Sequence, residues 1–271
     1  MAVATVLLPD SAERRGQAAV RLFATLPGGA CTGVYAAAFE IALTDVRLLA
    51  MPHPHPLRSW CARTGVQDAI VGGFFLRGSG EPLGELRTRG TRRRSVPFDA
   101  PWGALRSCIS AEGGDVRIAP REELPGAPRG DLLQAGPLLV REGRSLVVDG
   151  VDLEGFSAGR RQFDSDITRG RHPRAALGVG SGLVWAVACD GRSDEDAGMT
   201  LAELADYMVR LGVESAINLD GGGSTSLVLG GQLVNRPRDQ HGAPAHGGRR
   251  AADQHGARLR QALSCMDAAR F

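Results

Sequence analysis

TLAELADYMVRLGVESAINLDGGGSTSLVLGGQLV, from Thr200 to Val234, is the stretch of this sequence that says most about its fold. Thr200, with Glu203 three residues later, forms a capping box, which is a common start of a helix. Apolar residues then recur at helical spacing as far as Leu211, and Gly212 supplies a C-terminal cap. The spacing predicts a helix that packs one face on a sheet.

Strands follow this helix in the same stretch. Residues 215–219 and 225–229 are apolar runs typical of strands, and the three glycines at 221–223 lie between them. Gly230 and Gly231 suit a two-residue hairpin turn, because both positions of such a turn need a positive φ. The chain is then expected to return as a strand at residues 232–234.

Two further hairpins are predicted before the helix. They pair residues 138–140 with 145–148, and residues 175–179 with 183–189. Strand 183–189 is almost continuously apolar, which indicates burial of both its faces. The predicted fold class is therefore α+β: a single domain of mixed, mainly antiparallel twisted sheets with a few packed helices. The domain is expected to span residues 1–271, with its motif-bearing core at about residues 69–237.

The N-terminal half carries weaker signals. Strands and short helices are expected at Ala2–Leu8, Ala18–Leu26 and Val34–Leu49. The alternate prolines of Met51–Pro56 block helix and predict an extended segment. Residues 77–98 and 119–131, rich in glycine, proline and arginine, are predicted to be loops, and a short helix is expected at Ala257–Ala269.

The composition of the chain excludes several classes of function. The net charge is only +2, which argues against a nucleic-acid partner. No run of 18 apolar residues predicts a membrane span, and the N-terminus shows no secretory signal. The five cysteines are scattered and form no Cys-x-x-Cys pair, which is typical of buried thiols in a reducing compartment. We therefore expect a cytoplasmic protein with no metal and no cofactor.

The glycine turn after the predicted strand 215–219 is the strongest candidate site. Asp220 ends the strand, where a general acid or base or an acceptor for a sugar hydroxyl would be placed. Successive N–H groups in a glycine turn can form a nest for phosphate oxygens, and hydroxyl side chains add donors. The candidate binding residues here are Asn218, Gly221, Gly222, Gly223, Ser224 and Thr225. The structural alternative is a tight turn with a capping aspartate.

Three other segments carry polar or glycine signals. His172 and Arg174 would face one side if they lie on a strand, presenting a proton carrier beside a permanent charge. Asp190 and Arg192 follow the buried strand 183–189, and the acidic residues 194–196 after them could alternatively form a solvated loop or bind calcium. Gly72-Gly73 indicates either a close backbone approach or a β-bulge.

In their order along the chain, these segments resemble the phosphodiester glycosidase family. The matching pieces are VGGFF (71–75), AGPLLV (135–140), HPRAALGV (172–179), DGR (190–192), MTLAELADYM (199–208), INLDGGGSTSLV (217–228) and VNRP (234–237). The chain departs from the family at Val71, where an asparagine is usual. The last family segment after Pro237 is not evident, and the chain shows no clear strand from Arg238 onward.

The resemblance implies hydrolysis of a sugar-1-phosphodiester at the anomeric carbon, with the sugar-phosphodiester as a small-molecule partner. It points to a site built from Asp220, Asp190, His172, Arg174, Arg192 and the two glycine turns, with Arg236 added from the VNRP piece. We expect Asp220 to be the acid/base or nucleophilic carboxylate and Asp190 its partner, because glycosidases usually use two. The arginines and glycine N–H groups would hold the phosphate.

Other functions remain open at this stage. A non-catalytic carbohydrate- or phosphate-binding module would keep the fold without turnover, and a transglycosylase would use an alcohol in place of water. The substrate could be a small molecule or a nucleotide-linked sugar of secondary metabolism. A nucleotide-binding enzyme is a weaker rival, because the glycine turn has no P-loop lysine and no predicted helix after it.

Overall fold

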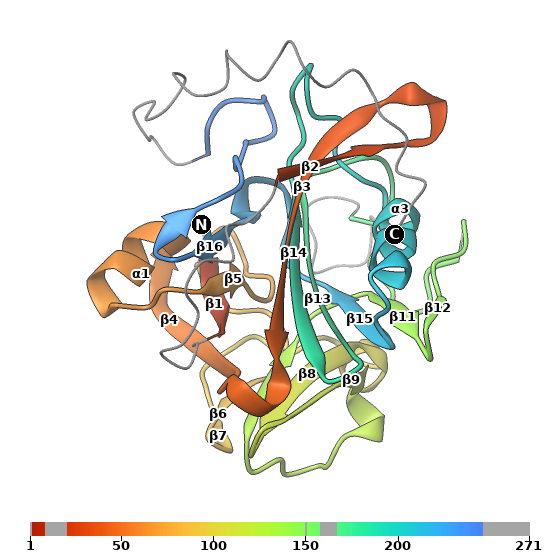
Figure 1. Cartoon of the computed structure of the whole chain (residues 1–271). Helices are drawn as coiled ribbons and strands as arrows, with labels where there is room; N and C mark the ends of the chain where they lie inside the picture. The colour runs from red at the N-terminus through yellow and green to blue at the C-terminus, as the bar shows by residue number, and fades with distance from the viewer. Residues whose placement is uncertain (1, 9–20, 150, 158–166, 246–271) are drawn as a thin grey trace.

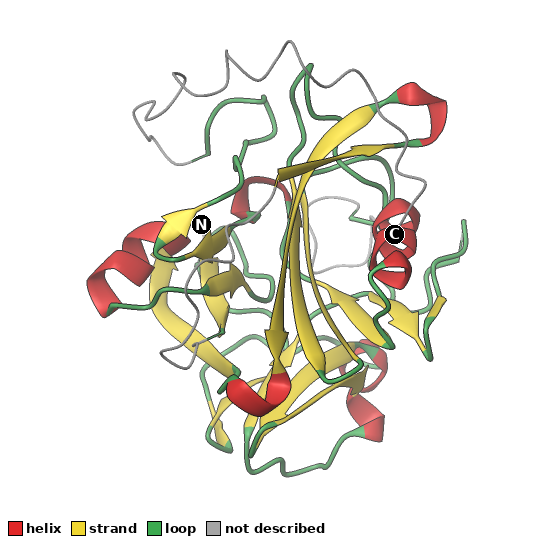
Figure 2. Ribbon diagram, viewed as in Figure 1, coloured by secondary structure: helices red, strands yellow, loops and turns green. Residues whose placement is uncertain are grey.

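The part of the chain that the structure describes folds into three antiparallel sheets and three α-helices (Figures 1 and 2). The computed structural model describes residues 2–8, 21–149, 151–157 and 167–245. The expected strand at Ala18–Leu26 is described only from Arg21, and the expected helix at Ala257–Ala269 lies outside the described residues. Every strand pairing is antiparallel, so the α+β fold class with mainly antiparallel sheets is confirmed.

A seven-stranded sheet runs through the middle of the molecule in the order β12-β11-β15-β13-β14-β3-β2. Its strands are β2 (Arg21–Thr25), β3 (Cys31–Glu40), β11 (Leu138–Arg141), β12 (Arg144–Ser145), β13 (Arg174–Gly180), β14 (Leu183–Cys189) and β15 (Ser215–Asn218). The β13–β14 hairpin matches the predicted pairing, and the β11–β12 hairpin forms where predicted, although β12 covers only residues 144–145 instead of 145–148. The long strands β3, β13 and β14 form its centre in Figure 1.

Two five-stranded sheets pack beside this one. The first, in the order β17-β16-β5-β1-β4, contains β1 (Ala2–Leu7), β4 (Arg47–His55), β5 (Ala69–Val71), β16 (Leu227–Leu229) and β17 (Gln232–Leu233). The second, in the order β7-β6-β10-β8-β9, contains β6 (Leu86–Thr88), β7 (Thr91–Arg92), β8 (Ser107–Glu112), β9 (Asp115–Pro120) and β10 (Asp131–Gln134).

The helices cover faces and ends of the sheets. They are α1 (Leu57–Thr64), α2 (Trp102–Leu105) and α3 (Leu201–Arg210). The predicted capping box of α3 is present, since the Thr200 hydroxyl accepts from the Glu203 N–H and the Glu203 carboxylate accepts from the Thr200 N–H. The apolar face of α3 packs on one side of the seven-stranded sheet, as expected. The main hydrophobic core, which includes Val6, Ile70 and Leu177, lies on the other side of the seven-stranded sheet.

The N-terminal half is more regular than the sequence suggests. Residues 86–88 and 91–92 of the predicted loop 77–98 form the β6–β7 hairpin, so that expectation was wrong in part. Residues 119–120 of the second predicted loop complete β9. The extended segment Met51–Pro56 is confirmed up to His55, where it ends β4. Because β4 is an edge strand, its prolines interrupt no ladder on the outer side.

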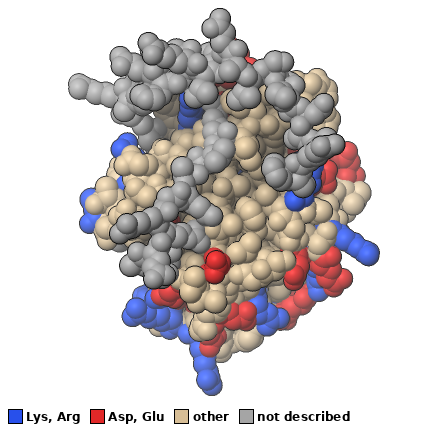
Figure 3. Space-filling view, in the orientation of Figure 1, with Lys and Arg blue, Asp and Glu red and all other residues tan. Residues whose placement is uncertain are grey.

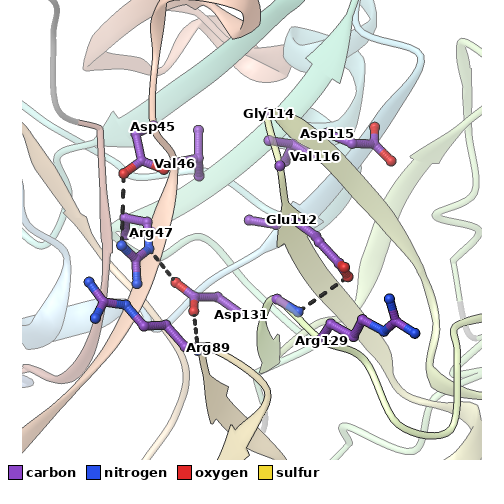
Figure 4. Close-up of a pocket in the computed structure, with 13 residues that line it drawn as sticks. Asp45, Val46, Arg47, Arg89, Glu112, Gly114, Asp115, Val116, Arg129 and Asp131 are labelled. Atoms are coloured by element: carbon purple, nitrogen blue, oxygen red, sulfur yellow. Dashed lines mark hydrogen bonds and ion pairs between the residues drawn. The ribbon is translucent and has the colours of Figure 1, made fainter.

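Charged side chains of both signs gather over the second five-stranded sheet, at the lower part of the face in Figure 3. A cavity of about 280 Å³ (Figure 4) has several charged residues and the buried Asp131 in its wall. The Asp131 carboxylate accepts from Arg47 Nε and the Leu48 N–H at 2.9 Å each, and from the Arg89 N–H at 2.6 Å. Asp131 therefore ties β4 and the β6–β7 turn to β10.

Candidate active site

A cavity of about 690 Å³ opens where several strands of the first and the central sheets end. Its wall is made by segments after β5, before β13 and after β15, together with a C-terminal loop. The residues that line the cavity include Phe74, Phe75, Arg77, Ile167, His172, Pro173, Arg174, Arg192, Asn218, Asp220, Gly221, Gly222, Gly223, Ser224, Asp239, Gln240 and His241. Ligand cavities commonly form at such strand ends, on loops carried by a rigid scaffold.

Asp220 lies in this cavity at the end of β15. Its N–H donates to the Gly72 carbonyl at 2.9 Å, which fixes the backbone at this point. Its Oδ2 atom is buried and has no hydrogen-bond partner in the described part of the chain. Burial raises the pKa of the Asp220 carboxyl from 3.8 to about 6, although the Ser224 hydroxyl, the Gly221 N–H and the Arg77 charge act in the opposite direction. Asp220 is thus a titratable group near neutrality.

Asn218, two residues earlier, also lines the cavity with an unpaired oxygen. The side chain is buried, and its Nδ2 donates to the carbonyl oxygens of Gly136 and Leu219 at 2.9 Å each. These two acceptors fix which end of the amide is nitrogen. Oδ1 has no donor among the described residues.

The glycine turn is held mainly by its own backbone. The Gly222 N–H donates to the Pro173 carbonyl at 2.8 Å, while the Ser224 and Thr225 N–H groups donate to Gly221 and Gly222 at 3.1 and 3.2 Å. These three amides are therefore not available for the phosphate nest that the sequence suggests. Thr225 is fully buried and lies behind the cavity wall.

Arg192 lies over the glycine turn. A Cβ atom at Gly222, whose φ is 58°, would come within 3.0 Å of Arg192 Nη2, so any other residue there would push the guanidinium away and strain the backbone. Arg192 Nη1 donates to the Arg238 carbonyl at 3.1 Å. Burial and the neighbouring charge of Arg77 lower the pKa of Arg192, with Asp239 opposing them. Two cations that share one cavity wall favour an anionic ligand.

Arg174 and His172 line the cavity but are engaged by backbone. The Arg174 guanidinium donates to the carbonyl oxygens of Met199, Ile167 and Gly170 at 3.0, 2.8 and 3.3 Å. His172 Nε2 lies 3.0 Å from the Arg169 carbonyl, which assigns the proton of the neutral ring to Nε2. The two side chains thus hold the segment 167–170 in the cavity wall.

Asp190 and Arg236 lie outside the cavity wall. The Asp190 carboxylate is buried, and it accepts from the Arg236 N–H at 2.6 Å and from the Tyr35 hydroxyl at 3.3 Å. The Arg236 guanidinium faces Glu195, 3.8 Å away. The structure therefore separates Asp190 from Asp220, and the expected pair of cavity carboxylates is not formed by these two residues.

Gly72 and Gly73 also stand behind the wall rather than in it. A Cβ atom at Gly72 would lie 2.9 Å from the Ala4 carbonyl, and one at Gly73 would lie 3.0 Å from Leu133. The close approach predicted at these glycines is therefore between strands of the protein. They bear on the site because Gly72 carries the carbonyl that holds Asp220.

Two segments of the site were missed at the sequence level. The first is Phe74–Arg77, which follows Gly72-Gly73 after the buried strand β5; the VGGFF piece includes its first two residues, but only the glycines were assigned to the site. The second is the loop around Asp239, whose Oδ1 accepts from the His241 and Ala243 N–H groups at 2.8 and 3.0 Å. Such a turn is typical of aspartate, but its place in the wall of the same cavity as Asp220 depends on the fold.

Within the acidic segment 194–196, Asp194 and Glu195 are exposed, while Asp196 is buried and its Oδ1 accepts from the Gly33 N–H at 2.7 Å. Across residues 2–8, 21–149, 151–157 and 167–245, no group of three or more His, Cys, Asp or Glu side chains is placed to hold a metal ion. Over the same ranges, no helix has the length and apolar character needed to cross a membrane.

Comparison with known proteins agrees with this architecture. The model of the phosphodiester glycosidase family matches residues 64–253. The chain belongs to the phosphodiester glycosidase family. The mouse N-acetylglucosamine-1-phosphodiester alpha-N-acetylglucosaminidase is 30% identical over 179 residues, which cover 65% of this chain and 34% of that protein. The human protein of the same name is 30% identical over 173 residues, covering 62% and 33%. The chain thus spans about a third of these relatives of the glycosidase family.

Solved structures share the fold. The zebrafish N-acetylglucosamine-1-phosphodiester alpha-N-acetylglucosaminidase catalytic domain, auto-inhibited by its pro-peptide, matches with a TM-score of 0.61 at 19% identity, covering 88% of this chain and 81% of that one. A hypothetical protein from Synechocystis matches with a TM-score of 0.57 at 19% identity, covering 80% and 58%. Both structures share the fold of this chain.

Proposed function

We propose that the chain hydrolyses the C1–O bond of a sugar-1-phosphodiester, releasing the free sugar and a phosphate monoester. The observation that carries this proposal is the placement of Asp220, with one buried unpaired carboxylate oxygen, in the same cavity as Arg192 and Arg77. A base and a cationic anchor are the two requirements of such a reaction. Relatives in the family carry N-acetylglucosamine-1-phosphodiester in their names, which supports this substrate class.

Asp220 is assigned the role of general base. In its ionised form it takes a proton from a water molecule, the water oxygen bonds to C1, and the C1–O bond breaks with its electron pair on the phosphate oxygen. A base whose pKa is about 6 is ionised at neutral pH yet holds a proton better than an ordinary aspartate. The departing phosphate monoester has a second pKa near 6, so it needs little help from an acid.

Arg192 and Arg77 are assigned to the phosphate. The diester carries one negative charge and the released monoester close to two, so both guanidinium groups interact more strongly as the bond breaks. The Arg192 fork suits two phosphate oxygens, and its Nη1 bond to the Arg238 carbonyl orients it. Arg174 and Asp190 are assigned to positioning, because their polar atoms already serve the backbone.

The test is to incubate the purified chain with an alkyl phosphodiester of N-acetylglucosamine-1-phosphate and, separately, with UDP-N-acetylglucosamine. Mass spectrometry then distinguishes free sugar from sugar phosphate, and NMR gives the anomer formed first. Free sugar with inverted configuration is expected, and Asp220→Asn should lower turnover by about 10³-fold or more while binding persists. Asp45→Asn, an exposed aspartate beside the other cavity, is the matched control.

Five outcomes would redirect the proposal. Sugar phosphate as product would mean cleavage of the P–O bond. Retained configuration would make Asp220 a nucleophile rather than a base. A mixed glycoside formed in the presence of an added alcohol would identify a transglycosylase, and binding without any product would identify a binding module. Turnover of the UDP-sugar in preference to the alkyl diester would point to nucleotide-linked substrates.

A further inference from the structure

Asn218, which lines the cavity, carries a buried polar atom for which the described residues supply no partner. Its Oδ1 is buried and has no donor in the described part of the chain, although the residue lines the cavity. A buried acceptor without a partner costs about 1–3 kcal/mol. Nearly all buried side-chain oxygens in folded proteins are paired, so each exception calls for an explanation. The donor for this atom is therefore expected to come from outside the protein.

A rotation of the Asn218 amide would not satisfy the unpaired Oδ1. Both Nδ2 hydrogens are used, one on the Gly136 carbonyl and one on the Leu219 carbonyl, at 2.9 Å each. An exchange of oxygen and nitrogen would set two carbonyl oxygens against Oδ1 and break both bonds. Oδ1 is consequently held in one position, as a recognition group requires.

A second buried asparagine, away from the cavity, has both ends of its amide paired. Asn235 Oδ1 accepts from the Leu227 N–H, and its Nδ2 donates to the Thr225 carbonyl, at 2.9 Å each. Asn235 is 4% exposed, close to the 2% of Asn218, but it does not line the cavity. The two residues share a structural role on the Nδ2 side and differ at Oδ1.

We infer that Asn218 Oδ1 accepts a hydrogen bond from the group on C2 of the bound sugar. This inference rests on the proposed function, which places C1 beside Asp220. Residues two apart in extended backbone are separated by about 7 Å. Asp220 reaches C1 through the water that it activates, which lies about 2.8 Å from the carboxylate and about 3 Å from C1, so a bent path through C1, its neighbour and one hydrogen bond of about 2.9 Å can close this separation. Next to C1 the ring oxygen carries no hydrogen and the phosphate accepts rather than donates, so the C2 substituent is the nearest donor, whether it is an acetamido N–H or a hydroxyl.

The experiment compares three sugar-1-phosphodiesters with the same aglycone, carrying a 2-acetamido group, a 2-hydroxyl group or only hydrogen at C2. Each is assayed with the wild-type chain, Asn218→Leu, Asn218→Asp and Asn235→Leu. Because the 2-deoxy sugar reacts faster intrinsically, the readout is the loss of kcat/KM caused by each substitution. For Asn218→Leu the loss should be about tenfold or more larger with a C2 donor than without one.

The variants separate recognition from damage to the fold. Asn218→Asp loses the same Nδ2 bonds but keeps an acceptor, so its losses should be similar for all three substrates. Asn235→Leu should also lower all three rates equally. Losses with Asn218→Leu that are the same for the three substrates, within about twofold, would overturn the inference while leaving the hydrolase intact. The substrate with the largest loss shows whether the donor is acetamido or hydroxyl.

A binding measurement keeps the inference testable if no substrate turns over. Calorimetry with the three corresponding sugar-1-phosphates should then show weaker binding of the 2-deoxy compound to the wild type and not to Asn218→Leu. That result would support the role of Asn218 and overturn the proposed hydrolysis. Equal binding of the three compounds to the wild type would overturn the inference itself.

Discussion

The Asp190 carboxylate accepts a hydrogen bond from the Arg236 N–H at 2.6 Å and joins two segments 46 residues apart. The same carboxylate accepts from Tyr35 on β3 at 3.3 Å. The segment after Arg236 continues into Arg238, whose carbonyl orients Arg192 in the cavity. Asp190 therefore affects the site indirectly, because it holds the backbone of the loop whose Arg238 carbonyl orients Arg192.

Asp190→Ala should destabilise the protein strongly. It leaves a buried tyrosine hydroxyl and a backbone N–H without the acceptor that they share, which predicts a loss of about 2–4 kcal/mol in the free energy of unfolding. Glu195→Ala removes the exposed carboxylate near the Arg236 guanidinium and should change stability by less than about 0.5 kcal/mol. Urea denaturation checks both, and equal effects would contradict the buried role of Asp190.

The activity of the wild type should depend on the Asp220 carboxyl. If the ionised form is the base, kcat/KM rises with pH until the carboxyl with a pKa of about 6 is fully ionised, and it levels off above that pH. The measurement is a pH profile of kcat/KM with the alkyl phosphodiester between about pH 4 and 9. A profile that falls through pH 6 would instead make protonated Asp220 an acid.

The same carboxyl should make stability depend on pH. Its pKa in the folded protein lies above the ordinary 3.8, so the cost of burying the ionised form is absent below pH 3.8 and complete above about pH 6. Asp220→Asn removes that cost and should raise the free energy of unfolding above pH 6 by up to about 3 kcal/mol. Thermal unfolding of the wild type and the variant at pH 4 and pH 8 checks this, since the difference should appear only at pH 8.

Gly222→Ala should damage the site more than the fold. The new Cβ atom would press on Arg192 Nη2 at 3.0 Å and displace the guanidinium, so kcat/KM should fall by about tenfold or more. Gly182→Ala is the matched control, because Gly182 also has a positive φ, 76°, but no atom within 4 Å of the added Cβ. Both should lose about 1 kcal/mol of stability, and only Gly222→Ala should lose turnover.

Asp131→Ala should weaken the junction of the first and second sheets. It removes the acceptor of Arg47 and of two backbone N–H groups, so a loss of about 3 kcal/mol is expected. Asp45→Ala removes a carboxylate that is 76% exposed and 3.8 Å from Arg47, and should have little effect. Turnover per folded molecule should be unchanged in both, because both residues lie beside the other cavity.

Sequence patterns predicted the elements that are determined by interactions between residues close together in the sequence. The capping box and apolar stripe fixed α3, and turn residues fixed the β11–β12 and β13–β14 hairpins. The β6–β7 hairpin escaped notice because its strands have three and two residues and depend on partners supplied by β10. No local pattern reveals such a strand.

The candidate site was predictable to a similar extent. The stretch of Asp220 with its glycines was identified because strand, carboxylate and turn are adjacent in the sequence. The separation of Asp190 from the cavity was not, because it depends on Tyr35 and Arg236, which are 155 and 46 residues away. The cavity role of Arg77 and His241 likewise follows from how distant segments meet.

The position of β1 between β4 and β5 has a consequence for biosynthesis. The Gly72 N–H donates to the Ala4 carbonyl, and the Gly72 carbonyl accepts from the Asp220 N–H, so the cavity draws on both early and late parts of the chain. Thr32 and Asp190 meet across 158 residues. During synthesis on the ribosome, β1, β4 and β5 are made first, and the edge of β5 has no partner strand until β16 has emerged. Such non-local pairing slows folding to the order of milliseconds to seconds, so overproduction should benefit from chaperones and low temperature.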